Sequence, residues 1–338
     1  MTPAATSRDR FRGCLIGQCL GDALGFIVEG EAPPVCAAYV EKVLKRGRAH
    51  EGRRGPSPFG QYSDDSQLAR ELMQSYAARG KFDAADYAAR VAAIFTEGRI
   101  VGKGRATEEA AMRLADGVPW QGAGTPPPSA GNGSAMRAGP IGLMFSSDGG
   151  ALARAAVDQG RITHTDPRCA AGAVAIAGAV SLALDGTAPS LFPERLAAWA
   201  DPLDAAMAGA LRDLGQWLDL APAGAVGPIS RAGLQPGYRD AWQGISPYVV
   251  GSVIWSLYAF LRSPDDYWES ICTAIAVGGD VDTTAAMTGA IAGARNGLGA
   301  VPGDLARRLN DNGTWTYDEL AGLADRVWEI SLKGGKQP

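Results

Sequence analysis

The chain has 338 residues, a hydrophobic content of 46% and a formal net charge of −4 at pH 7. This length is enough to bury a sizeable core in one large domain or two smaller ones. The weak negative charge argues against a general affinity for nucleic acid or for an anionic membrane surface.

The cysteines and the apolar segments indicate the compartment. Five cysteines are present without any CxxC spacing, which is typical of buried thiols in a reducing environment: Cys14, Cys19, Cys36, Cys169 and Cys272. The N-terminus lacks the basic start and apolar stretch of a signal peptide, and we expect no membrane-spanning run without polar interruption. We therefore expect a cytoplasmic protein.

Hydrophobic residues recur at helical spacing along most of the chain. Apolar positions from Phe11 to Cys19 follow the i, i+3, i+4, i+7 pattern, and residues 82–95 and 107–114 do the same. Alternation with a period of two, typical of strands, is almost missing. The pattern predicts an all-α fold, which we expect to form a single compact multi-helix domain over residues 8–333.

Capping residues predict where several helices begin and end. Gly80 should end a helix that starts near Gln67, and Asn296-Gly297 should end one that starts near Ala285. X-Pro pairs should open three further helices, which are Asp166-Pro167 through Leu184, Ser246-Pro247 through Leu261 and Ser263-Pro264 through Val277. The stretches 42–54, 122–133 and 221–237 are expected to be surface loops.

Two clusters of neighbouring acids stand at predicted helix starts. They are Ser63-Asp64-Asp65-Ser66 and Asp280-Val281-Asp282-Thr283-Thr284. Such residues are good helix caps, so capping is the simpler interpretation of either cluster alone. Capping needs only one oxygen, however, and each cluster offers two carboxylates and a hydroxyl. Because carboxylates brought together repel, the doubled pattern favours a site for two hard cations such as Mg²⁺.

Other metal, phosphate and nucleophile sites fit the sequence poorly. An EF-hand starting at Asp280 would need Gly and Glu at the positions held by Ala285 and Ile291. Fewer than sixty residues follow Asp282, which is too few for an aspartyl-phosphate phosphatase. The chain has no GxxxxGK[ST] or GxSxG motif, and two histidines cannot make a His-rich zinc site.

Three further features are weak when taken singly. The turn Gly131-Asn132-Gly133-Ser134-Ala135-Met136-Arg137 is rich in small residues that allow backbone N–H groups to approach a phosphate. His164 precedes a helix cap, and Glu29 follows the Gly21-Asp22-Ala23-Leu24-Gly25 segment.

Together and in this order, the segments resemble the ADP-ribosylglycohydrolase family, which includes the dinitrogen-reductase-activating glycohydrolase. The segment from Gly13 to Glu29 is similar to the family's GxxxGxxxGDAxGxxxE opening, and Ser63-Asp64-Asp65-Ser66 to its [ST]DD[ST] element. The turn from Gly131 to Arg137 matches GNGxxMR, Thr163-His164 matches a TH-containing segment, and residues 278–283 match GGDxDT.

The resemblance implies an all-α fold with a cleft that holds two Mg²⁺ ions, for which Mn²⁺ can substitute. The implied metal ligands are Ser63, Asp64, Asp65, Asp280, Asp282 and Thr283. The implied catalytic residues are Glu29, on a flap over the site, with Asp65, Asp280 and Asp282. The implied substrate-binding residues are Gly131, Asn132, Gly133, Ser134, Met136, His164 and Gly102.

The resemblance also implies the reaction, which is removal of ADP-ribose from a modified protein side chain by cleavage at the anomeric carbon. Arginine is slightly favoured as the modified residue, although residues 102–107 lack the Asp that some arginine-specific members carry there. Serine-linked ADP-ribose or a free ADP-ribosyl small molecule is the alternative substrate. A binding or structural homologue without turnover is the non-enzymatic alternative. We expect a monomer with neither nucleic acid nor membrane as partner.

Overall fold

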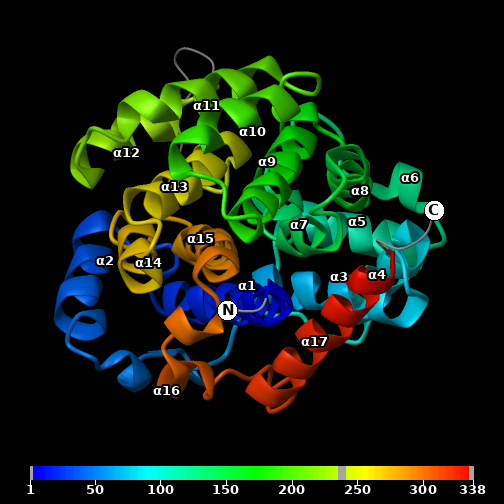
Figure 1. The fold of residues 1–338 in the computed structure, drawn as a ribbon, viewed down its shortest axis with the longest axis horizontal. Helices are drawn as coiled ribbons and strands as arrows, with labels where there is room; N and C mark the ends of the chain where they lie inside the picture. Colours follow the sequence, from blue (N-terminus) through cyan, green and yellow to red (C-terminus); the bar gives the residue numbers. More distant parts are fainter. Residues whose placement is uncertain (1–2, 235–240, 335–338) are drawn as a thin grey trace.

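Helices α1 (Pro3–Gly25) and α15 (Val281–Asn296) cross at the centre of the computed structural model, which describes residues 3–234 and 241–334 (Figure 1). Other helices surround this pair on all sides, so the all-α, single-domain prediction is confirmed. In chain order these are α2 (Pro33–Tyr39), α3 (Asp64–Arg79), α4 (Ala84–Thr96), α5 (Arg105–Ala115), α6 (Trp120–Ala123), α7 (Gly139–Met144), α8 (Gly149–Arg161), α9 (Pro167–Leu184), α10 (Phe192–Ala200), α11 (Ala205–Trp217), α12 (Pro222–Arg231), α13 (Val249–Arg262), α14 (Tyr267–Ile275), α16 (Gly303–Ala306) and α17 (Tyr317–Gly334).

Short elements connect the helices. The antiparallel pair β1 (Arg53–Arg54) and β2 (Ser57–Pro58) is the sole sheet within the described ranges. A π-helical turn, Val40–Leu44, and 3₁₀ turns, among them η1 (Phe26–Val28) and η4 (Asn132–Ser134), account for most of the remaining regular structure.

Small residues let α1 and α15 approach each other backbone to backbone. Glycines recur every fourth position on one face of α1, and they meet the backbone of α15 in the antiparallel sense. A Cβ added at Gly17 would lie 2.6 Å from the carbonyl oxygen of Gly289, a distance that real Cβ atoms do not reach. The facing pairs are Gly13 with Gly293, Gly17 with Gly289, Gly21 with Ala285 and Gly25 with Val281.

Helices α9 and α13 form the second layer of the core. All residues of α13 from Val249 to Leu261 are buried, and α9 is buried over nearly its whole length, as predicted. Two segments, Ser7–Val28 and Pro167–Leu184, are long and apolar enough to cross a membrane by length and composition. However, 89% and 78% of their apolar windows are buried within the protein, as core helices are. The five cysteines are free and buried, as expected.

Most predicted boundaries are close to the observed ones. Helix α3 ends at Arg79, followed by Gly80 in the left-handed conformation with φ 69°, and α15 ends at Asn296, before Gly297. Asp166 caps α9 by accepting a hydrogen bond from the N–H of Arg168.

Four predicted helix starts are wrong by two to four residues. Helix α3 begins at Asp64 and α15 at Val281, earlier than the predicted starts near Gln67 and Ala285. Helix α13 begins at Val249 because the preceding residues pair with the turn at Gly131, where the N–H of Asn132 donates to the carbonyl of Pro247. Helix α14 begins at Tyr267 because Asp266 is the better cap and accepts the N–H of Glu269 at 3.0 Å.

The predicted surface loops are partly wrong. Residues 222–231 form α12, with Pro222 in its first turn and Ala225 and Ile229 buried one turn apart. The prolines and glycines of this stretch led to the wrong prediction of a loop. Residues 235–237 of that predicted loop lie outside the described residues. The stretch 42–54 contains the end of the π-helical turn, a 3₁₀ turn and strand β1, and the stretch 122–133 includes the end of α6 and part of η4.

The close approach of α1 and α15 predicts a large cost for one added methyl group. Gly17→Ala should lower the free energy of unfolding by about 1–3 kcal/mol, because neither backbone can withdraw without repacking the centre of the molecule. Denaturant unfolding measures the effect. The control Gly215→Ala lies at an exposed position of α11 with nothing within 4 Å of the added Cβ, and should instead stabilise by about 0.5–1 kcal/mol. Equal effects at the two positions would contradict the backbone contact.

Candidate active site

A cavity of about 480 Å³ opens where the first turns of α3, α5 and α15 meet the turn η4. Most of the residues expected at the site line it. These are Glu29, Asp64, Asp65, Gly102, Gly131, Asn132, Gly133, Met136, His164, Asp280, Asp282 and Thr283. Ser63 and Ser134 do not line the cavity, although both are buried beside residues that do.

The first acid cluster is held in place by a buried acid of α1. Asp22 accepts the backbone N–H of Ser63 at 2.9 Å and that of Ser66 at 3.0 Å, so its carboxylate holds the first turn of α3. We did not single out Asp22 from the sequence. The sequence feature that could have marked Asp22 is a charged residue among the apolar and small residues of α1, because burying a carboxylate without a partner would be costly.

The hydroxyl of Ser63 caps α3, so Asp64 and Asp65 are not needed as caps. Its Oγ accepts the N–H of Asp65 at 3.4 Å and donates to Oδ2 of the same residue at 2.9 Å. The other carboxylate oxygen, Asp65 Oδ1, is buried without a hydrogen-bond partner. A buried carboxylate oxygen left in this way is costly unless a cation binds it.

The second acid cluster is positioned by a glycine turn. Gly278 and Gly279 have φ of 76° and 90°, and the turn pairs with two other segments. Gly279 donates to the carbonyl of Glu31 at 3.1 Å, and Asp280 donates to that of Ile245 at 2.8 Å. Any side chain at Gly279 would be strained and would meet the backbone of Ile245, so the backbone itself aims Asp280 at the cavity.

Capping does not account for the second cluster either. Asp280 occupies the N-cap position of α15 but makes no side-chain capping bond. Its Oδ2 instead accepts the side-chain N–H of Asn132 at 2.5 Å, which ties the acid to the turn η4. Asp282 Oδ1 accepts the N–H of Thr283 at 2.8 Å.

Burial raises the pKa values of the clustered carboxyl groups and so disfavours their ionised form when no metal is bound. It raises the pKa of Asp280 to about 7 and that of Asp22 to about 6, in each case against hydrogen bonds that lower it. Burial, together with neighbouring carboxylates, raises the pKa values of Asp64, Asp65 and Asp282 well above the ordinary value. Carboxylate oxygens of Glu29, Asp280 and Asp282 lie within 4.8 Å of one another. This oxygen-rich set fits a hard cation.

Glu29 reaches the cavity from the segment that follows η1. Its backbone carbonyl accepts Nη1 of Arg54 at 2.8 Å, and its Oε2 lies 3.3 Å from Nη2 of the same residue. Arg54 stands on β1 and stacks over Phe26 at 5.4 Å. Burial raises the pKa of Glu29, and the charge of Arg54 opposes that rise.

The turn η4 forms the opposite wall, against His164. A Cβ at Gly133 would lie 2.7 Å from Cε1 of His164, so only glycine leaves space there. Burial lowers the pKa of His164 to about 3, and its Nδ1 lies 2.8 Å from Oγ1 of Thr163. The ring is therefore neutral at physiological pH.

Buried polar side chains support this wall from behind. Arg137 donates to the carbonyl of Gly133 at 2.9 Å and to Thr163 Oγ1 at 2.7 Å. Ser134 Oγ donates to the carbonyl of Cys169 at 2.9 Å and points away from the cavity. Like Asp22, Arg137 thus supports the site from behind. The sequence indicated it only as the last residue of the Gly131–Arg137 turn.

Comparison with known proteins agrees with the site. The family model for ADP-ribosylglycohydrolase matches residues 3–336. The chain is 31% identical to ADP-ribosylhydrolase ARH3 of Homo sapiens, over 97% of this chain and 96% of that protein. It is 28% identical to ADP-ribosylarginine hydrolase Tri1 of Pseudomonas putida, over 89% of this chain and 74% of that protein. A solved structure described as an ADP-ribosylglycohydrolase-related protein complex superposes with a TM-score of 0.74 at 27% identity, covering 97% and 99% of the two chains.

The acid-lined cavity and the family match lead to the same conclusion. The chain belongs to the ADP-ribosylglycohydrolase family, and the resemblance seen in the sequence is confirmed. It is accordingly an enzyme that acts on glycosidic bonds to ADP-ribose, which sets aside the non-enzymatic alternative.

The raised carboxyl pKa values predict how pH affects the metal-free protein. A folded-state pKa above the unfolded value of about 4 means that the native state binds protons more tightly, so stability is lost as pH rises through that pKa. With Asp22 near 6 and Asp280 near 7, the melting temperature in EDTA should fall from about pH 4 to about pH 7. Asp280→Asn should flatten this dependence. A melting temperature that rises over the same interval would contradict the repulsive acid cluster.

Proposed function

We propose that the protein is a Mg²⁺-dependent hydrolase of the N- or O-glycosidic bond that links ADP-ribose to a modified protein side chain. It would thereby reverse mono-ADP-ribosylation. The observation that carries the proposal is that five acids line one cavity, namely Glu29, Asp64, Asp65, Asp280 and Asp282. Arg54 is hydrogen-bonded to Glu29, and among the described residues no basic side chain is hydrogen-bonded to the other four. A set of buried acids that lacks its own counter-charge fits two divalent cations.

The proposed ligands are Ser63, Asp64 and Asp65 from α3, with Asp280, Asp282 and Thr283 from α15. Asp65 Oδ1, buried and without a partner, supports this assignment most directly. When bound, Mg²⁺ would balance the carboxylates and polarise oxygen ligands, and Mn²⁺ would substitute for it.

The remaining residues suit the reaction class. Positive charge that builds on the ribose during cleavage is favoured by nearby carboxylates, which Asp65, Asp280 and Asp282 provide. Burial raises the pKa of Glu29, which suits a carboxyl group that takes part in a late proton transfer. Gly131 and Gly133 leave room for phosphates and the distal ribose to approach the backbone, beside the neutral ring of His164.

Arginine is slightly favoured as the modified side chain. The similarity to a protein described as ADP-ribosylarginine hydrolase Tri1 supports this preference. A second candidate is an O-linked substrate such as serine-linked ADP-ribose, or a free ADP-ribosyl small molecule. It is favoured by the cavity wall at residues 102–106, where Lys103 and Arg105 are present and no acid is available to meet a guanidinium group. We further propose a cytoplasmic monomer that binds neither nucleic acid nor membrane.

An assay with a panel of ADP-ribosylated substrates tests the proposal directly. Arginine-, serine- and small-molecule-linked ADP-ribose should be compared with added Mg²⁺, with EDTA, and with EDTA followed by Mn²⁺. We expect release of ADP-ribose from arginine with either cation and none in EDTA. Asp282→Asn should be folded and nearly inactive, whereas the surface change Asp213→Asn should be active. Full turnover in metal-free protein would contradict the metal mechanism, and release from serine alone would shift the linkage to the second candidate.

Glu29 should act in turnover more than in metal binding. Glu29→Gln keeps the size of the side chain but removes its charge and its ability to transfer a proton, so kcat should fall by ~10²-fold or more. The rise in melting temperature on adding Mg²⁺ should remain. If the variant instead lost that rise while metal-saturated turnover stayed normal, Glu29 would be a metal ligand and not a catalytic group.

A further inference from the structure

One wall of the cavity is formed by a short segment, residues 99–104, between α4 and α5. Its Gly102, Lys103 and Gly104 line the cavity. Glycines with φ of 66° and 73°, Gly98 and Gly102, flank residues 99–101. Such positions allow the backbone to turn freely, so contacts from elsewhere must fix this wall.

Gln67, one turn into α3, supplies those contacts. Its side-chain Nε2 donates to the carbonyl of Arg99 at 2.9 Å, and its Oε1 accepts the N–H of Val101 at 2.9 Å. One amide thus satisfies a carbonyl and an N–H two residues apart in the segment. The backbone of α3 adds a third contact, in which the N–H of Asp64 donates to the carbonyl of Val101 at 2.7 Å.

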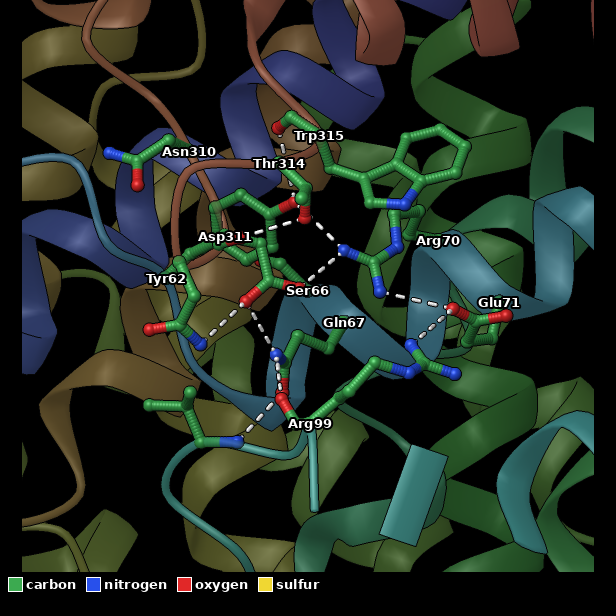
Figure 2. Close-up of polar contacts among 12 residues, drawn as sticks. Tyr62, Ser66, Gln67, Arg70, Glu71, Arg99, Asn310, Asp311, Thr314 and Trp315 are labelled. Carbon is green, nitrogen blue, oxygen red and sulfur yellow. Dashed lines mark hydrogen bonds and ion pairs between the residues drawn. The ribbon is translucent and has the colours of Figure 1, made fainter. Parts of the chain in front are cut away.

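Gln67 is itself held by a buried carboxylate, Asp311. Its Nε2 also donates to Asp311 Oδ1 at 2.8 Å, so both amide hydrogens and the amide oxygen are used (Figure 2). Asp311 Oδ2 accepts Nη1 of Arg70 at 2.6 Å, and Arg70 also donates to Glu71 at 3.0 Å. The guanidinium lies 5.0 Å from the centre of the Trp315 ring. A fully buried arginine with two carboxylate partners makes a rigid anchor.

We infer that Gln67 is a positioning residue that holds residues 99–104 as a wall of the substrate cavity, with Asp311 as its anchor. The inference rests on the proposed function for the identity of the substrate. Gln67 lies three residues after Asp64 on the same helix, so it sets the wall relative to the acids. Its side chain does not line the cavity. It acts through the segment that it holds.

Substitution by methionine separates positioning from catalysis. Gln67→Met keeps a long unbranched side chain but removes the bonds to Arg99, Val101 and Asp311. We expect KM for the ADP-ribosylated substrate, and Kd for free ADP-ribose with Mg²⁺, to rise by roughly 10-fold, as the loss of one or two buried hydrogen bonds would give. The kcat should stay within about 3-fold, and the Mg²⁺-induced rise in melting temperature should remain. Gln74→Met, the same change at a half-buried position of α3, should alter none of these.

Hydrogen exchange tests the inference without any assay of turnover. In the wild-type protein the amide of Val101 should exchange slowly, although its segment is a loop at the cavity. In Gln67→Met, residues 99–104 should exchange faster while the middle of α3 keeps its protection. A fast Val101 amide in the wild type, or an unchanged KM, Kd and exchange pattern in the variant, would overturn the inference. Absence of activity on every ADP-ribosyl substrate would contradict the proposed function, and the exchange result would still decide the role of Gln67.

Discussion

The backbone contact between α1 and α15 is the constraint on which the rest of the structure depends. The two helices run antiparallel, so the C-terminal end of α1, at Gly25, lies beside the N-terminal end of α15, at Val281. Asp22, Glu29 and the acids at the start of α15 therefore meet in one region. Larger residues at this crossing would separate the helix axes and move these acids apart.

Two kinds of buried charge are found on either side of α3. On one side, the charge of Arg70 is balanced by Asp311 and Glu71, although its Nε is buried without a hydrogen-bond partner. On the other side, Asp64 and Asp65 face Asp280 and Asp282 without a basic partner hydrogen-bonded to them. The same helix thus carries one network in which the buried charges are balanced and one in which buried carboxylates lack a basic partner. The contrast supports a functional origin for the second.

The site is built mainly at helix ends and on backbone groups. Acids at the first turns of α3 and α15 lie in the favourable field of the helix N-termini, which offsets part of their mutual repulsion. The glycines at residues 278, 279 and 133 allow close packing around the site. A Cβ at Gly278 or Gly279 would meet the backbone of a neighbouring segment, and one at Gly133 would meet His164. Repulsion among these buried acids lowers the stability of the metal-free protein, a cost that is common at functional sites.

The sequence alone determined the fold class, the ends of several helices and the two acid clusters. Helical periodicity and local caps such as Asp166, Gly80 and Gly297 depend on near neighbours in the chain, so they could be predicted from it. The family could be predicted as well, because five spaced segments each carried a recognisable local pattern.

Only the tertiary structure decided which distant residues support the site. The roles of Asp22 and Gln67 depend on backbone groups that are 32 or more positions away in sequence, and Arg137 also depends on the hydroxyl of Thr163, 26 positions away. No local pattern records such partners. The helix α12 was missed for a similar reason, since its packing against α13 outweighs the turn preference of its prolines and glycines. Local preference sets where most helices form and end, but burial and long-range hydrogen bonds decide where a helix such as α13 begins and which side chains reach the cavity.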